Sequence, residues 1–260
     1  MMNKQIAAFA ALGMVASAGA VGFSGGVYQE NFDGMLGDET VSVNPDFSLP
    51  GADGWYAPTQ ISYRVSDGTL SKAGLYSAGQ PGSTDRALGI AQADSADYFF
   101  LALTNDTGIT LNELQFDLFG EVWRLPETYI NPANGQVEPN PGVMRATYRV
   151  GGAAWDDGAY SSLSALNVTS PTGVPESQTP QDGNLNRQHL TTDLTGFNLL
   201  PGQTFWFRYD GVNGKGSDGL LAIDDLTITA PQAQPVPEPC TLSAAAFGLL
   251  LFARRRKRAA

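Results

Sequence analysis

Short runs of alternating apolar and polar residues recur along this chain and constrain its fold more than any other feature. In residues 144–150, apolar side chains alternate with Arg145, Thr147 and Arg149. Successive side chains of a β-strand point to opposite faces, so this pattern places one face in a core and the other in water. Similar runs predict strands at residues 61–65, 98–103, 114–118, 204–209 and 220–228.

The central residues 21–231 have a suitable length for one all-β domain. Clusters of Gly, Pro, Asn and Asp separate the alternating runs, and no helical period appears before the C-terminal tail. Two sheets that each bury one face produce this alternation, so we expect a jelly-roll-like β-sandwich. Two polar connections, 126–142 and 171–183, are too long for hairpins and predict surface loops that either bind a ligand or are tolerated insertions.

Residues 1–20 have the composition of a secretory signal peptide. Lys4 precedes an apolar stretch at 6–15, and small residues follow at Ala16, Ala18 and Ala20. This order predicts export, with cleavage after Ala18 or Ala20. Export permits disulfides, but the chain has one cysteine, Cys240, so no intramolecular disulfide is possible.

The C-terminal end consists of three segments of different composition. A Pro-rich linker at 232–240 precedes an uncharged apolar segment at 241–253, and a basic tail follows at 254–260. Cationic flanks stay on the cytoplasmic side of a membrane, so the central domain is expected outside. The apolar segment is shorter than the ~20 residues of an ordinary spanning helix, which predicts a weak anchor. The cations of the membrane stop are Arg254, Arg255, Arg256, Lys257 and Arg258.

Together the three segments resemble the PEP-CTERM sorting signal, with Pro237, Glu238 and Pro239 as its signature. The resemblance implies recognition by an exosortase-like protease in the inner membrane of a Gram-negative bacterium, with only transient anchoring. It also implies cleavage near Pro239 and release to the cell surface or medium. A permanent C-terminal anchor is the alternative.

The central domain also resembles secreted bacterial β-sandwich domains that often accompany PEP-CTERM signals. The resemblance implies the sandwich fold but no particular activity. It is carried by residues 30–34, 74–77, 83–89, 103–108, 120–124 and 219–226.

Charge excludes several classes of partner. The whole chain has a net charge of −11, whereas the central domain holds nine basic against 25 acidic residues, a net of −16. Such a surface repels phosphates, so nucleic acids and anionic lipid surfaces are not expected as partners. It favours solubility outside the cell and, alternatively, binding of divalent cations.

Catalytic patterns are scarce. His189 is the only histidine and has no nucleophile-elbow pattern near it, and zinc and phosphate motifs are missing from the sequence. A glycosidase needs two carboxylates facing a cleft, and Glu121 beside Trp123 is the one to test. The alternative is an ion pair of Glu121 with Arg124 or another arginine, with Trp123 in the core. We therefore expect no enzymatic activity.

A structural calcium ion is a further hypothesis. In many jelly rolls the first and last strands are antiparallel neighbours, so acids at both ends of the domain can converge and offer oxygen ligands. The apolar positions in 220–228 also switch parity at the adjacent Asp pair, which predicts a β-bulge. The alternative is that these acids cap turns by bonding to backbone amides. The candidate ligands are Glu30, Asp33, Asp224 and Asp225.

Aromatic residues in turn-like contexts suggest sugar binding, because exposed rings can stack on the apolar faces of sugars. The candidates are Trp55, Tyr56, Tyr129 and Trp155, and core or edge packing is the alternative for each. The leading hypothesis is a non-enzymatic, exported surface or extracellular-matrix protein associated with exopolysaccharide or biofilm. The second is a carbohydrate-binding module, and a distant third is an extracellular hydrolase.

Overall fold

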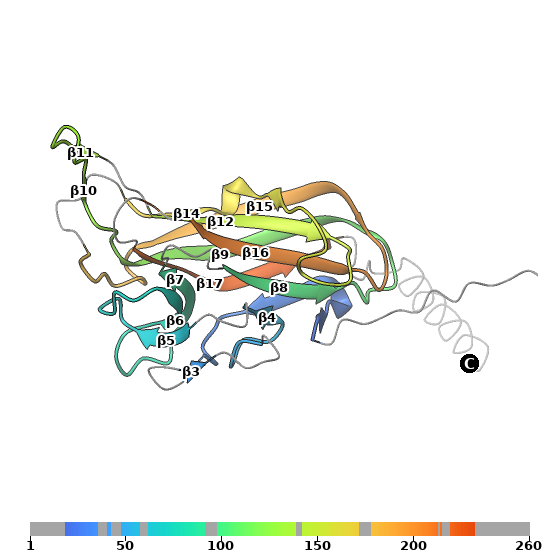
Figure 1. Ribbon diagram of the computed structural model, residues 1–260. Helices are drawn as coiled ribbons and strands as arrows, with labels where there is room; N and C mark the ends of the chain where they lie inside the picture. Colours follow the sequence, from blue (N-terminus) through green and yellow to red (C-terminus); the bar gives the residue numbers. More distant parts are fainter. Residues whose placement is uncertain are drawn as a thin grey trace, which may run out of the picture.

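The computed structural model describes residues 19–35, 41–42, 48–57, 62–91, 98–138, 142–171, 178–212, 214 and 219–231. Within these residues the chain forms two β-sheets that pack face to face, which confirms the predicted all-β sandwich (Figure 1). Residues 1–18 of the predicted signal peptide, and the predicted Pro-rich linker, apolar segment and basic tail, lie outside the described residues. No helix in the described ranges is long and apolar enough to cross a membrane.

The first sheet has seven strands. In spatial order its main path is β1 (Val21–Gly22), β8 (Tyr98–Thr104), β16 (Thr204–Val212), β12 (Val143–Val150) and β13 (Ser161–Ser162). Two short strands extend it: β4 (Trp55–Tyr56) beside β8, and β14 (Val168–Thr169) beside β12. Every pairing is antiparallel except β1 with β8.

The second sheet has eight strands. Its main path is β15 (Arg187–Leu199), β9 (Leu111–Arg124), β17 (Leu220–Thr229), β7 (Ala87–Ala91), β6 (Gly74–Ala78), β5 (Ser62–Ser66) and β3 (Val41–Ser42). The eighth strand, β2 (Val27–Glu30), pairs with the second half of β17. The first and last long elements of the domain are thus antiparallel neighbours, as expected.

The core lies between the sheets and is rich in aromatic rings. Trp55 is at its centre, fully buried, with ring centroids 5.4 Å from Phe32, 5.5 Å from Phe99 and 6.4 Å from Phe207. Phe116 of the second sheet lies 5.1 Å from the Phe207 ring of the first sheet, which joins the two layers. Contacts of this kind contribute beyond the area that they bury.

All six strands predicted from alternation are present. In β12, Met144 and Ala146 enter the core while Arg145, Thr147 and Arg149 are on the outer face, as the pattern requires. The bulge in β17 is confirmed as well: the pairing with β9 shifts register between Asp224 and Thr227. Asp225 has φ of 50°, and the apolar residues on both sides of the bulge are in the core.

The connections contain further structure. Two 3-10 turns are present, η1 (Ser24–Gly26) and η2 (Ser164–Leu166). Within the expected loop 126–142, the described residues 130–137 are mostly exposed, and the loop contains a two-stranded ribbon, β10 (Tyr129–Ile130) and β11 (Val137–Glu138), that projects from the sandwich (Figure 1). The described end of the 171–183 connection packs on the second sheet, where a Cβ at Gly183 would lie 2.2 Å from the Trp123 indole.

Candidate functional site

The outer face of the first sheet carries a cluster of aromatic side chains. In β8, Phe99, Leu101 and Leu103 enter the core, so the alternate residues Tyr98, Phe100 and Ala102 lie on the opposite face. Register aligns Phe100 with Tyr56 of β4 on one side and Arg208 of β16 on the other. Trp206 of β16 lies on the same face and aligns with Ala102.

Stacked rings build this face into a platform. Phe100 lies between Tyr56 and Trp155, with centroids 5.5 and 5.7 Å away and both interplanar angles at 24°. Trp155 also contacts Tyr98 at 5.4 Å. Phe100 is almost fully buried at 2% exposure, whereas Tyr56, Tyr98 and Trp155 are half-buried. We call the set Tyr56, Tyr98, Phe100, Trp155, Tyr160 and Trp206 the aromatic face.

The loop 151–160, which brings Trp155 and Tyr160 to this face, is fixed by hydrogen bonds. The Trp206 indole donates to the Gly151 carbonyl at 3.0 Å, and the Arg149 guanidinium donates to the Ala154 carbonyl. Gly152 has φ of 87°, and a Cβ there would lie 2.6 Å from Arg149 Nη1. The Tyr160 hydroxyl donates to the Trp155 carbonyl at 2.8 Å. Trp155 is therefore held in place before any ligand arrives.

The electrostatic environment keeps the phenol groups protonated. Burial raises the pKa of Tyr98 to about 12, although the Arg208 guanidinium beside it acts in the opposite direction. Burial also raises the pKa of Tyr56 and of Tyr160. The Tyr98 hydroxyl therefore remains a hydrogen-bond donor or acceptor at neutral and mildly alkaline pH, whereas the Tyr56 and Tyr160 hydroxyls already donate to carbonyls and remain acceptors.

The structure brings together two of the four predicted sugar-binding residues. Tyr56 and Trp155 both stack on Phe100. Trp55 is a correction: it precedes Tyr56 in β4 and so faces the core, where it is 0% exposed and cannot meet a ligand. Tyr129 lies apart from them, in the projecting ribbon.

Four residues of the aromatic face were not predicted from the sequence as site residues: Tyr98, Phe100, Tyr160 and Trp206. The available signal was in residues 98–103, where the outward positions are as apolar as the inward ones. A strand with one face in water normally carries polar residues at those outward positions. An apolar run on the outer sheet face therefore indicated a covered or ligand-binding surface.

Three of the predicted calcium ligands accept hydrogen bonds from backbone amides. Glu30 accepts one from the Phe32 amide at 2.8 Å and Asp224 one from the Asp225 amide at 2.7 Å, local bonds of the kind that the turn-capping alternative predicts. Asp33 accepts one at 3.1 Å from the amide of Arg86, which is distant in sequence. Glu30 and Asp225 also line one open pocket of about 380 Å³.

Metal binding at these acids stays a prediction. Within the ranges that the structure describes, no group of three or more His, Cys, Asp or Glu side chains is arranged to hold a metal ion. Asp225 instead lies 3.8 Å from Arg187, across the outer face of the second sheet.

Two buried carboxylates lie on adjacent strands of the second sheet. Glu121 is 0% exposed and Asp224 is 2% exposed, so a polysaccharide does not reach either group. Glu121 Oε2 accepts a hydrogen bond of 2.8 Å from the Trp123 indole, which corrects the expected arginine ion pair while confirming that Trp123 is buried. Burial raises the pKa of Glu121 to about 7 and, together with the nearby Glu121 charge, that of Asp224 to about 8.

His189 shows no catalytic arrangement. It lies on the edge strand β15, half-exposed, with Nε2 2.9 Å from Asp117 Oδ1. Both side chains are more than half exposed, so His189 is a surface residue.

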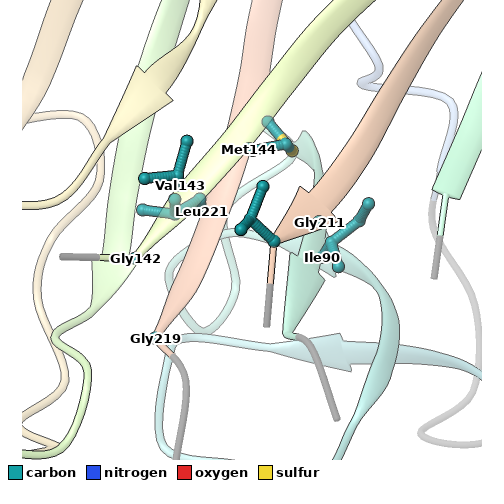
Figure 2. Close-up of a pocket in the computed structure, with 8 residues that line it drawn as sticks. Ile90, Gly142, Val143, Met144, Gly211, Gly219 and Leu221 are labelled. Atoms are coloured by element: carbon teal, nitrogen blue, oxygen red, sulfur yellow. The ribbon is translucent and has the colours of Figure 1, made fainter. Parts of the chain in front are cut away.

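A small apolar hollow lies between the sheets. Figure 2 shows it between Ile90, Met144 and Leu221, with three glycines in its wall. Its volume is about 10 Å³, which is at most room for one water molecule. The hollow is too small for a sugar.

Among known proteins, the chain is similar only in its fold to several solved structures. No family model matches the chain, and no curated protein matches its sequence. Among solved structures, the xylan-binding domain from CBM 22 is 14% identical, with 82% of this chain and 97% of that domain covered and a TM-score of 0.38. TmCBM27, a carbohydrate-binding module with specific mannan recognition, is 12% identical, with 78% and 98% covered and a TM-score of 0.33.

A cleaved adhesin domain of Lys-gingipain from Porphyromonas gingivalis is also similar. It is 12% identical, with 78% of this chain and 98% of that domain covered and a TM-score of 0.31. At such low scores and identities these likenesses assign neither a family nor a ligand to this chain.

Proposed function

We propose that the domain is a non-catalytic, jelly-roll-like polysaccharide-binding module, and that the aromatic face is its binding site. The observation that most supports this proposal is the stacking of the half-exposed Tyr56 and Trp155 rings on Phe100. Its position on a sheet supports a rigid platform, and little conformational entropy is lost when a ligand binds a preformed site.

The chemistry of the face suits a sugar. Aromatic rings offer an apolar surface to the C–H groups of a pyranose, while the protonated Tyr98 and Tyr160 hydroxyls can bond to its hydroxyl groups. Binding sites of this kind combine an apolar lining with a few placed polar groups. The buried positions of Glu121 and Asp224 make hydrolysis the weaker alternative.

Replacing the indole at the rim should remove most of the binding. Trp155→Ala is expected to weaken affinity for the bound polysaccharide at least about tenfold, because buried Trp contacts dominate binding energy at many interfaces. Affinity electrophoresis of the full chain in gels that contain xylan, glucomannan or alginate measures this. Unchanged retardation of Trp155→Ala, in the gel that retards the original protein, would contradict the proposal.

We further propose that the chain is exported and sorted at its C-terminal end, so that the module acts at the cell surface or in the extracellular matrix. Structure around the cleavage region supports one of the two expected sites. The Gly19 carbonyl accepts a hydrogen bond from Tyr56, Ala20 packs against the aromatic face, and Val21 pairs with Leu103. Cleavage after Ala18 keeps these contacts, whereas cleavage after Ala20 removes two of them.

The intact mass of the protein from its host tests both processing steps. We expect a chain that begins at Gly19 and lacks the residues after about Pro239, since the exosortase-like protease cuts there. Recovery of residues 254–258 in extracellular material would contradict sorting. A mass that corresponds to a chain beginning at Val21 would contradict the role of Gly19 and Ala20 in the fold.

A further inference from the structure

Three arginines gather on the outer face of the first sheet. Arg145 and Arg149 lie on β12, and Arg208 lies beside them on β16. The central domain has only nine basic residues against 25 acidic ones, so three arginines on one face are a local concentration of its positive charge. Two of them contact the aromatic face: Arg149 lies 5.4 Å from the Trp206 ring, and Arg208 lies 4.1 Å from the Tyr160 ring.

Asp210, on the same face, is already fully engaged. Its Oδ1 lies 3.0 Å from Arg208 Nη2, and its Oδ2 lies 3.0 Å from Arg208 Nε. The Thr147 hydroxyl lies 3.2 Å from the same Oδ2. This bidentate pair neutralises Arg208 and leaves little acceptor capacity for a second guanidinium.

Among the described residues, Arg145 and Arg149 have no carboxylate partner. Although Arg145 aligns with Asp210 in register, neither Arg145 nor Arg149 has a carboxylate oxygen within 4.0 Å among the described residues. Arg149 is 9% exposed and its buried Nε has no hydrogen-bond partner in that part of the chain. A buried cation is costly unless it is paired, and among the described residues Arg149 contacts the Tyr160 and Trp206 rings and donates to the Ala154 carbonyl.

The position of Arg145 fits a ligand that also covers the rings. Arg145, Asp210 and Tyr98 form one cross-strand row on the outer face. Neighbouring strands are about 4.8 Å apart, so the backbones of Arg145 and Tyr98 are separated by about 10 Å. Arg145 is exposed. A chain of sugars on the rings can therefore place a substituent beside its guanidinium.

From this geometry we infer that the aromatic face selects acidic polysaccharides, in which a sugar carboxylate such as that of a uronic acid pairs with Arg145. The inference rests on the proposed function and names its class of ligand. Guanidinium and carboxylate match as a bidentate, charge-assisted pair. The acidic remainder of the domain repels polyanions that do not also offer apolar sugar faces to the rings.

Binding of the full chain, kept soluble with a non-ionic detergent, tests the inference by calorimetry. The probes are polygalacturonate and alginate as acidic polymers, xylan and glucomannan as neutral ones, and polyglutamate as an acidic polymer without sugars. We expect acidic polysaccharides to bind at least about tenfold more tightly than neutral ones, with an advantage that falls as salt rises. We expect polyglutamate to bind weakly.

The decisive variant is Arg145→Gln, because Arg145 is exposed and carries no described contact that the fold needs. It should lose about tenfold in affinity for the acidic polysaccharides and keep its affinity for neutral ones. The matched control is Lys72→Gln, which removes one exposed positive charge from the connection between β5 and β6 and should change nothing.

Three outcomes would overturn the inference. Equal affinity for neutral and acidic polysaccharides would reject it while keeping the proposed function. Equal affinity for polyglutamate and alginate would show general attraction of anions. A complete lack of polysaccharide binding would reject the proposed function along with the inference.

Discussion

The protein should be less stable at about pH 9 than at about pH 5, against the usual effect of paired carboxylates. Glu121 and Asp224 are buried on adjacent strands, and desolvation raises the pKa of each, to about 7 and about 8. The charged groups that face them are mostly acidic: Asp85 and Asp225 disfavour their ionisation, whereas the Trp123 hydrogen bond and Arg187 favour ionisation of Glu121.

The sign follows from proton binding. Both pKa values are higher in the folded protein than in the unfolded chain. At a pH between the unfolded and folded values, the folded state therefore binds more protons than the unfolded state. Stability is therefore fully present below about pH 4 and is lost as pH rises through about 7 and 8. Each unit of pKa difference corresponds to ~1.4 kcal/mol, so the loss should reach several kcal/mol.

Thermal melts in EDTA from about pH 5 to about pH 9 measure this loss without interference from divalent cations. Asp224→Asn should melt at a higher temperature than the original protein at the alkaline end, because asparagine keeps the oxygen that accepts the Asp225 amide. Asp193→Asn, an equal charge change at an exposed site in β15, is the control. The prediction would be contradicted if the melting temperatures of Asp224→Asn and the original protein changed with pH in the same way across this range.

Trp55→Ala should destabilise the fold by ~3–5 kcal/mol, because it leaves a large cavity among aromatic rings that cannot all collapse. The indole is fully buried and contacts the Phe32, Phe99 and Phe207 rings. Urea unfolding followed by circular dichroism measures the change in the free energy of unfolding.

Trp155→Ala is the matched control for that experiment, since it is the same substitution at a half-buried residue of a surface loop. It should cost less than about 1.5 kcal/mol in stability while it removes polysaccharide binding. If both variants lost similar stability, Trp155 would be a core residue and the aromatic face would not be a surface.

Sequence alternation predicted the central strands and even the bulge in β17. The parity of Leu221 and Ile223 differs from that of Leu226 and Ile228, and a bulge is what lets all four enter the core. Strand β15 was not predicted, because it lies at an edge and is mostly polar, with buried residues only at Leu190, Leu194, Phe197 and Leu199.

The candidate site was predictable only in part. Adjacent aromatic residues such as Trp55 and Tyr56 look alike in sequence, and only the strand register decides which one faces the core. Likewise, the contact between Trp155 and Phe100 joins a loop to a strand more than fifty positions earlier, and local patterns do not contain that information. The strand register determines which sheet face each side chain occupies, whereas the packing of the loop 151–160 determines which rings are in contact.

The same limit applies to charge. Composition showed an acidic domain, but the gathering of Arg145, Arg149 and Arg208 depends on the pairing of β12 with β16. The burial of Glu121 and Asp224 also depends on neighbours that are distant in sequence, such as Gly183, which covers the Trp123 indole.

Hydroxyl-radical footprinting of the full chain, with and without a bound polysaccharide, tests the location of the binding site most directly. We expect the polysaccharide to protect Tyr56, Tyr98 and Trp155. Phe119 and His189, on the outer face of the second sheet, should be as reactive with polysaccharide as without it. Protection of Phe119 and His189, or of Tyr129 in the ribbon, with unchanged reactivity at Trp155, would contradict this expectation.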